Sequence, residues 1–244
     1  MITIIQYKTV NVDGLDVFYR EAGDPSKPAF VLLHGFPSSS SMFRNLMPLL
    51  ARDFHVLAPD LIGFGNSAAP SRESFEYTFE NLTGFLAALK VDQYFLHVFD
   101  YGAPIGFRLA MRQPERVLGI VSQNGNIYQE GLGPKWAERA KYWANPTPEP
   151  RAQYESAFAP ATIKGQYLTG EKPGTVGPDG YSLDIAHTTE PGYAERQDDL
   201  IFDYQTNVAL YPQFQDYVRQ YQPENLAAWG KNDPSFIYPG APRS

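Results

Sequence analysis

A strand-like run that ends on an aspartate and turns at once into a helix is the feature that most restricts how this chain can fold. Residues 94–99 are rich in aromatic and β-branched side chains, Asp100 follows them, and Gly102 precedes a helix-like stretch at 105–110. Such a sharp turn exposes the residue at its tip, and the first turn of the following helix points backbone N–H groups toward it. A carboxylate in that position is a candidate nucleophile.

Further apolar runs alternate with helical spacing along the first half of the chain. Asp13-Gly14 is a strong hairpin signal between the first two strands. Strands are expected at 3–12, 15–22, 29–33, 55–59, 94–99 and 117–121, and helices at 42–50, 78–89 and 105–110. This alternation predicts an α/β fold with a mostly parallel central sheet. Ligands of such sheets bind beyond the carboxyl ends of the strands, where His34, Asp60 and Asp100 fall.

The composition and the periodicity of the sequence change near residue 125. Strand-like runs vanish, prolines cluster, and helical spacing is found at 134–143, 151–158 and 197–220. A strand signal returns at 226–230. We interpret the helical part as a cap inserted over the ligand edge of the sheet. The predicted division is a first part of the core at 1–124, a cap insertion at 125–222 and a return to the core at 223–244.

Composition narrows the classes of function. The net charge of −7 and the pI near 5.1 argue against a nucleic-acid partner, which would favour a basic surface. The absence of cysteine excludes disulfides and thiolate metal sites. The N-terminus lacks the pattern of a signal peptide, and no stretch has the length of a membrane span. We therefore expect a cytoplasmic protein with neither a membrane nor a nucleic-acid partner.

Three short motifs fall, in order, at the ends of expected strands. They are His34–Pro37, Phe99–Gly102 and Trp229–Asp233. Together they resemble the α/β-hydrolase superfamily, and within it the aspartate-nucleophile branch of epoxide hydrolases and haloalkane dehalogenases. That resemblance implies an α/β-hydrolase fold with an inserted helical cap.

The resemblance also implies a role for each motif. Asp100 would attack an sp³ carbon of a small electrophilic substrate and form an alkyl-enzyme ester, which water then cleaves. The backbone N–H groups of Phe36 and Tyr101 would form the oxyanion hole for the second step. Asp233 matches the triad acid, which orients the base. His34 is expected at the substrate pocket as a structural loop residue rather than as an acid or base.

The choice of substrate depends on the cap. Epoxide hydrolases use cap tyrosines as proton donors, and we expect Tyr142 and Tyr211 to face the substrate pocket. Haloalkane dehalogenases instead usually carry tryptophan after the nucleophile, where this chain has Tyr101. Val98, where the family favours small residues, indicates a slightly altered elbow. An epoxide-hydrolase-like activity is therefore favoured; a haloalkane-dehalogenase-like activity and a catalytically inactive binding protein stay open.

One expected group is missing. The resemblance implies a base histidine after one more strand beyond Asp233 and then a final helix, but the sequence ends at Ser244. The fold is thus expected to lack its last strand and helix, and turnover is in doubt because water would be poorly activated. The uncovered sheet edge is expected to allow homo-oligomers. None of the four histidines is expected to act as the base; they are His34, His55, His97 and His187.

A cofactor and a metal are not expected. Gly63–Ala68 matches the Gly-x-Gly-x-x-Gly/Ala pattern of dinucleotide-binding loops and follows a strand. Pro70 interrupts the helix that this fingerprint needs. The same residues fit the Gly-x-Gly-x-Ser loop that hydrolases of this type carry.

Overall fold

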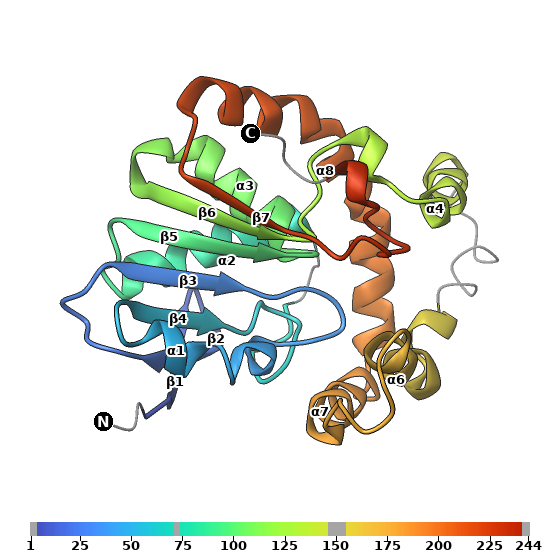
Figure 1. The fold of residues 1–244 in the computed structure, drawn as a ribbon, viewed down its shortest axis with the longest axis horizontal. Coiled ribbons are helices and arrows are strands. Elements are labelled where there is room, and N and C mark those ends of the chain that lie inside the picture. Colours follow the sequence, from blue (N-terminus) through green and yellow to red (C-terminus); the bar gives the residue numbers. More distant parts are fainter. Residues whose placement is uncertain (1–3, 71–73, 146–154, 241–244) are drawn as a thin grey trace.

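The computed structural model describes residues 4–70, 74–145 and 155–240. Its centre is a seven-stranded sheet with the order β1-β2-β4-β3-β5-β6-β7 (Figure 1). The pairs β1–β2 and β2–β4 are antiparallel, and the strands from β4 to β7 pair in parallel. The strands are β1 Gln6–Val12, β2 Leu15–Ala22, β3 Ala29–Leu33, β4 His55–Pro59, β5 Tyr94–Phe99, β6 Val117–Gln123 and β7 Asn225–Ala228.

Helices cover the two faces of the sheet unequally. In Figure 1, α2 and α3 lie behind the sheet and the short α1 lies in front. Alternate residues of β3 supply the two cores: Val31 and Leu33 join the large cluster under α2 and α3, whereas Phe30 and Leu32 join a smaller one with α1. The core helices are α1 Met47–Leu50, α2 Phe75–Ala88 and α3 Gly102–Arg112.

The cap helices lie beyond the carboxyl ends of the parallel strands (Figure 1). They are α4 Lys135–Ala144, α6 Pro160–Leu168, α7 Pro178–Thr188 and α8 Tyr193–Tyr221. With 29 residues, α8 runs from the cap back to the core, where it packs on α3.

A buried arginine joins α8 to the core. Arg108 of α3 is 1% exposed, and its guanidinium donates to Thr206 Oγ1 at 3.2 Å, to Asn207 Oδ1 and to Glu76 Oε2 at 3.3 Å. Because a buried guanidinium needs partners for its donors, this cluster fixes α8 against α2 and α3.

Most of the expected core elements are confirmed, with their ends shifted by a few residues. The hairpin turns at Asp13 and Gly14, both with positive φ, as its sequence predicts. The helix expected at 42–50 is wrong in form: a 3₁₀ turn, Ser40–Phe43, capped by the Ser39 side chain, precedes the single turn of α1. Pro48 at the start of α1 favours a new helical turn there over continuation of the first.

The cap differs more from expectation. Helices α6 and α7 were not predicted, and α8 begins at Tyr193 rather than 197. Half of the helix expected at 151–158 lies outside the described residues, and Glu155–Phe158 form a 3₁₀ turn. The domain boundaries at 125 and 223 stay a prediction, since α8 belongs to both cap and core. β7 forms one edge of the sheet, and all four of its residues are exposed.

Candidate active site

Asp100 stands at the tip of the turn between β5 and α3, with a φ of +47°. That left-handed conformation is strained for a residue with a side chain, and the packing around it explains why it persists. A Cβ at Gly35 would lie 2.3 Å from Asp100 Cβ, and one at Gly102 would lie 2.6 Å from the Leu33 carbonyl oxygen. The two glycines let the loop after β3 and the start of α3 approach the turn closely.

Val98 fits this turn without displacing it. A Cβ at Gly106 would lie 2.4 Å from Val98 Cγ1, and one at Gly125 would lie 3.3 Å from Val98 Cγ2. Gly106 of α3 and Gly125 of the loop after β6 have no side chains, and this leaves room for the two methyl groups of Val98.

Two backbone donors hold the Asp100 carboxylate. The Phe36 N–H donates to Oδ1 at 2.8 Å, and the Tyr101 N–H also hydrogen-bonds to the carboxylate. Burial raises the pKa of Asp100 to about 6, while these two bonds and the charge of Arg139 oppose the rise. The structure thus brings together three of the residues singled out from the sequence, and part of the Asp100 surface stays accessible.

Asp233 lies in the loop after β7 and is held by three donors. Asn124 Nδ2 donates to Oδ2, and the backbone N–H groups of Ser235 and Phe236 donate to Oδ1 at 2.7 and 3.0 Å. Its negative charge contributes to the raised pKa of Asp100. The expected acid and nucleophile therefore share one edge of the sheet.

His34 braces the loop that carries Phe36. The Leu61 N–H donates to His34 Nε2 at 2.9 Å, which leaves Nδ1 to donate to the Gly35 carbonyl oxygen at 3.2 Å. Burial lowers the pKa of His34. Because both ring nitrogens have partners and the ring is neutral, this geometry fits the structural part that the sequence suggests for His34.

The other histidines lie away from the Asp100 carboxylate. His55 pairs with Glu21 at 2.7 Å, and His97 hydrogen-bonds to Gln123 at 3.1 Å. His187 lies on α7 in the cap. Within the described residues, no histidine hydrogen-bonds to Asp100 or Asp233.

Aromatic rings surround the tip of the elbow. The Tyr101 ring is the centre of the group, with ring centroids of its neighbours between 5.1 and 6.3 Å away. These neighbours come from the loop after β3, the glycine loop after β4, α2 and α8, and they are Phe36, Phe64, Phe75 and Tyr204. The site is therefore apolar apart from its carboxylates, backbone donors and tyrosine hydroxyls.

The tyrosines nearest Asp100 are not the two singled out from the sequence. Tyr142 packs against Phe202, and the Tyr211 hydroxyl binds Asn126 Nδ2 at 3.2 Å and the Tyr204 hydroxyl at 3.3 Å. The charge of Asp100 acts instead on Tyr204 and on Tyr193, and burial raises both of their pKa values well above the usual range. Leu200, Tyr204, Val208 and Tyr211 recur at helical spacing in the sequence, and that periodicity is the signal that could have pointed to Tyr204.

The indole N–H groups of all three tryptophans have acceptors in the protein. Trp136 donates to the Ser235 carbonyl oxygen at 3.0 Å, Trp143 to that of Ile201 at 2.9 Å, and Trp229 to that of Phe236 at 2.8 Å. No indole donor is therefore directed at Asp100.

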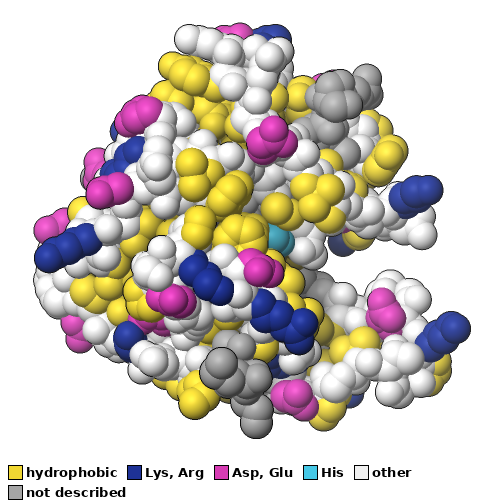
Figure 2. All heavy atoms as spheres, turned by 60° about the vertical axis from the view of Figure 1, so that its left-hand side comes forward, with side chains coloured by type: hydrophobic (Ala, Val, Ile, Leu, Met, Phe, Trp, Pro, Cys, Tyr) yellow, Lys and Arg dark blue, Asp and Glu magenta, His cyan; other side chains and the backbone are white. Residues whose placement is uncertain are grey.

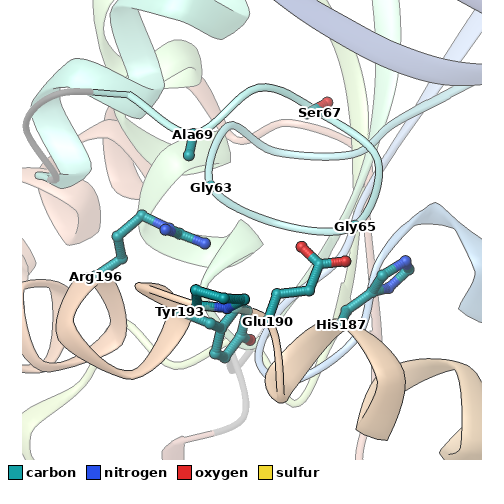
Figure 3. A pocket seen from close by; sticks show the side chains of 9 residues that line it. Gly63, Gly65, Ser67, Ala69, His187, Glu190, Tyr193 and Arg196 are labelled. Carbon is teal, nitrogen blue, oxygen red and sulfur yellow. The ribbon is translucent and has the colours of Figure 1, made fainter.

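A pocket of about 200 Å³ lies beside this site, between the glycine loop and the start of α8. Figure 3 shows Arg196 and Glu190 pointing toward the loop, with Tyr193 below them. Asp100 does not line it, so Tyr193 is the residue that connects the pocket with the site. Its lining is Gly63, Gly65, Ser67, Ala69, His187, Glu190, Pro191, Tyr193 and Arg196.

The glycine loop is organised around Asp60. The Asp60 carboxylate accepts from the N–H of Ser40 at 2.7 Å and of Asn66 at 2.8 Å, and a Cβ at Gly65 would lie 2.2 Å from it. Across the described residues, no group of three or more His, Cys, Asp or Glu could hold a metal ion. No helix in that part of the chain is both long and apolar enough to cross a membrane.

Comparison with known proteins agrees with this geometry. Residues 28–163 match the α/β hydrolase fold family, so this chain belongs to that family. It is 44% identical to the uncharacterized hydrolase YNR064C of Saccharomyces cerevisiae, over 94% of this chain and 81% of that protein. A haloalkane dehalogenase of Bradyrhizobium diazoefficiens is 37% identical over 118 residues, which are 48% of this chain and only 38% of the dehalogenase.

Solved structures show the same fold at lower identity. A putative ancestral haloalkane dehalogenase superposes with a TM-score of 0.75 at 23% identity, covering 92% of this chain and 81% of that one. Cfl2 from Burkholderia cenocepacia superposes with a TM-score of 0.74 at 20% identity, covering 93% and 88%. The protein is therefore a hydrolase of the α/β fold with dehalogenase-like relatives.

Proposed function

We propose that this hydrolase opens small epoxides by attack of the Asp100 carboxylate on a ring carbon. The attack forms one C–O bond, breaks one C–O bond of the oxirane and leaves a hydroxyalkyl ester on Asp100. The observation that carries this proposal is the hydrogen-bonded carboxylate at a strained turn, whose charge acts on the buried tyrosines Tyr193 and Tyr204. Phe36 and Tyr101 would then stabilise the oxyanion that water forms on the ester carbonyl.

Tyr204 is the proposed proton donor to the opening oxygen. Asn126 Nδ2 donates to the Tyr211 hydroxyl, which can in turn donate to the Tyr204 oxygen. When Tyr211 is the donor of this pair, the Tyr204 proton is free for the substrate, and its raised pKa keeps it on the oxygen at neutral pH. The alkoxide is a much stronger base than a phenolate, so the transfer is favourable once the ring opens.

The tryptophans favour an epoxide over a haloalkane. A departing halide is stabilised by hydrogen-bond donors, and the three indole N–H groups already donate to carbonyl oxygens. Tyrosine hydroxyls are suited to an oxygen leaving group that needs a proton. The dehalogenase relatives nevertheless make a haloalkane the second candidate substrate, with the tyrosine hydroxyls as halide ligands.

The second half of the reaction is proposed to be slow. No histidine of the described residues hydrogen-bonds to either carboxylate, so none of these histidines is positioned to activate water. The ester on Asp100 should therefore accumulate, and release should be the slow step of any turnover.

Mass spectrometry of the intact chain tests this proposal. After exposure to 1,2-epoxybutane, we expect one added epoxide mass, mapped by peptide sequencing to Asp100. The Asp100→Asn variant should stay unlabelled. Labelling by 1-bromobutane but not by the epoxide would instead support the haloalkane substrate. Absence of labelling by either would support a binding protein without this chemistry.

A further inference from the structure

One face of α8 carries buried polar groups that have no hydrogen-bond partner in the described part of the chain. They include the hydroxyl of Tyr193 and both polar atoms of the Gln197 amide, and Asn207 Nδ2 is a further one nearer the core end of the helix. Gln197 is completely buried, and Tyr193 is 2% exposed. Because buried amides in folded proteins are nearly always hydrogen-bonded, Gln197 calls for an explanation beyond packing.

Helix geometry places Gln197 on the side of α8 that faces Asp100. Residues 193, 197 and 204 lie within about 40° of one another on an α-helix. Tyr204, at one end of this row, packs with its ring 6.0 Å from that of Tyr101, and Tyr193, at the other end, lies within reach of the Asp100 charge. Gln197 lies between the two tyrosines.

Two other glutamines of α8 have structural roles, because their amides form hydrogen bonds within the protein. Gln205 Nε2 donates to the Phe202 carbonyl oxygen at 3.0 Å, and Gln215 Nε2 donates to that of Ile127 at 2.8 Å. Both fix their surroundings through the amide. Gln197 fixes nothing in this way, since neither polar atom of its amide has a hydrogen-bond partner among the described residues.

We propose that Gln197 is a substrate-recognition residue, whose amide binds a neutral hydroxyl or carboxamide carried beside the reacting carbon. This inference rests on the proposed function of Asp100. An amide offers one donor and one acceptor, which match these groups, and the Tyr193 hydroxyl adds a donor. Two negative charges, those of Asp184 and Asp100, and one positive charge, that of Arg196, act on Tyr193. The excess of negative charge disfavours an anionic substituent.

The test compares glycidol with 1,2-epoxybutane, two epoxides of similar size of which only glycidol carries a hydroxyl. The rate of Asp100 esterification is measured by mass spectrometry for each, in the wild type and in Gln197→Leu. We expect the glycidol-to-epoxybutane rate ratio to fall about ten-fold in the variant, the usual effect of one lost hydrogen bond of about 1.4 kcal/mol. The variant should also unfold about 2–4 °C higher, because a bare buried amide has been removed. Gln205→Leu is the matched control and should leave the ratio unchanged.

The results separate this inference from the proposed function. If wild-type Asp100 is labelled but the rate ratio is the same in Gln197→Leu, Gln197 does not recognise the substituent. A variant that loses rate on both epoxides equally and unfolds at a lower temperature would assign Gln197 a structural role. If Asp100 is labelled by no electrophile at all, the proposed function itself fails, and this inference fails with it.

Discussion

Around Asp100, the core supplies groups that are hydrogen-bonded and sterically fixed, whereas two groups of the cap, at Tyr193 and Gln197, are buried without hydrogen-bond partners among the described residues. Asp100, Asp233 and His34 each have defined donors or acceptors. On α8, the Tyr193 hydroxyl and the Gln197 amide have none among the described residues. A fixed half suits the attack on carbon, which needs one geometry. The unpaired hydroxyl and amide of the cap suit selection among substrates, because a ligand with matching groups gives them hydrogen bonds that the protein does not.

The largest expected effect is on the rate of Asp100 labelling, after a change in the core beside Asp100. Gly35→Ala would place a Cβ 2.4 Å from Asp100 Oδ1, so we expect Asp100 labelling by an epoxide to slow more than about 100-fold, the scale of a 1 Å misplacement. Gly165→Ala, where a new Cβ meets nothing within 4 Å, is the matched control. Circular dichroism shows whether the Gly35 variant is folded. A folded variant labelled at the wild-type rate would show that the turn tolerates displacement.

The next effect concerns the cap donor. Tyr204→Phe should slow the reaction of Asp100 with an epoxide about 100-fold, because the opening oxygen loses its acid. The reaction with an alkyl bromide should change much less, since bromide leaves without a proton. Tyr142→Phe, a cap tyrosine that packs on Phe202, serves as the control. Equal losses on both substrates would contradict the assignment of Tyr204 as a proton donor.

The hydrogen bonds that join α8 of the cap to the core can also be removed. Arg108→Met removes the guanidinium that binds Asn207 and Thr206 of α8, and we expect the free energy of unfolding to fall by about 2–3 kcal/mol. The half-exposed Arg112 also pairs with Glu76, at 2.6 Å, and Arg112→Met should cost less than about 1 kcal/mol. Urea unfolding measures both. Similar losses in the two variants would mean that the buried cluster does not hold α8.

The smallest effect is the dependence on pH. With the pKa of Asp100 at about 6, esterification should rise about ten-fold per pH unit below 6 and level off above it, since only the carboxylate attacks. A raised acid pKa means that the native state binds more protons than the unfolded one, so stability should fall as the pH rises from about 4 to about 6. Rates and unfolding midpoints between pH 4 and 8 check both trends. A flat rate profile would contradict the burial of this carboxylate.

The core was most predictable where a strand is an unbroken apolar run between turn residues. Val31, Leu32 and Leu33, for example, are completely buried, and β3 cannot be mistaken for a surface strand. The order of the motifs then fixes which loops meet at Asp100. Helices α6 and α7 gave no such signal because each buries few side chains, among them Ile163 and Asp184.

The cap half of the site was harder to predict. Which tyrosines face Asp100 depends on how α8 is rotated and on where it starts, and both are set by packing on α3 rather than by local sequence. Whether the Gln197 amide has a hydrogen-bond partner depends on the residues that pack around it, and the sequence alone does not show which these are.

The edges and faces of the sheet also differ in how well they are covered. Figure 2 shows hydrophobic side chains gathered across the middle of one face of the molecule, among scattered charged groups. Phe95 and Val121 are only partly buried on the side of α1, and Leu226 of β7 is 61% exposed. Self-association through the β7 edge, expected from the sequence, stays a prediction that sedimentation at several concentrations can check.

The continuous course of α8 has a mechanical consequence. Tyr193 lies about 21 Å along the helix from Asn207, where Arg108 fastens it to the core. A tilt of about 10° around that fastening point would carry Tyr193 about 4 Å, which is more than the width of a water molecule. Gln197, closer to the fastening point, would move less. A small rotation of this part of α8 would therefore change the space beside Asp100 without unfolding any cap helix, and the length between Asn207 and Tyr193 sets the size of that change.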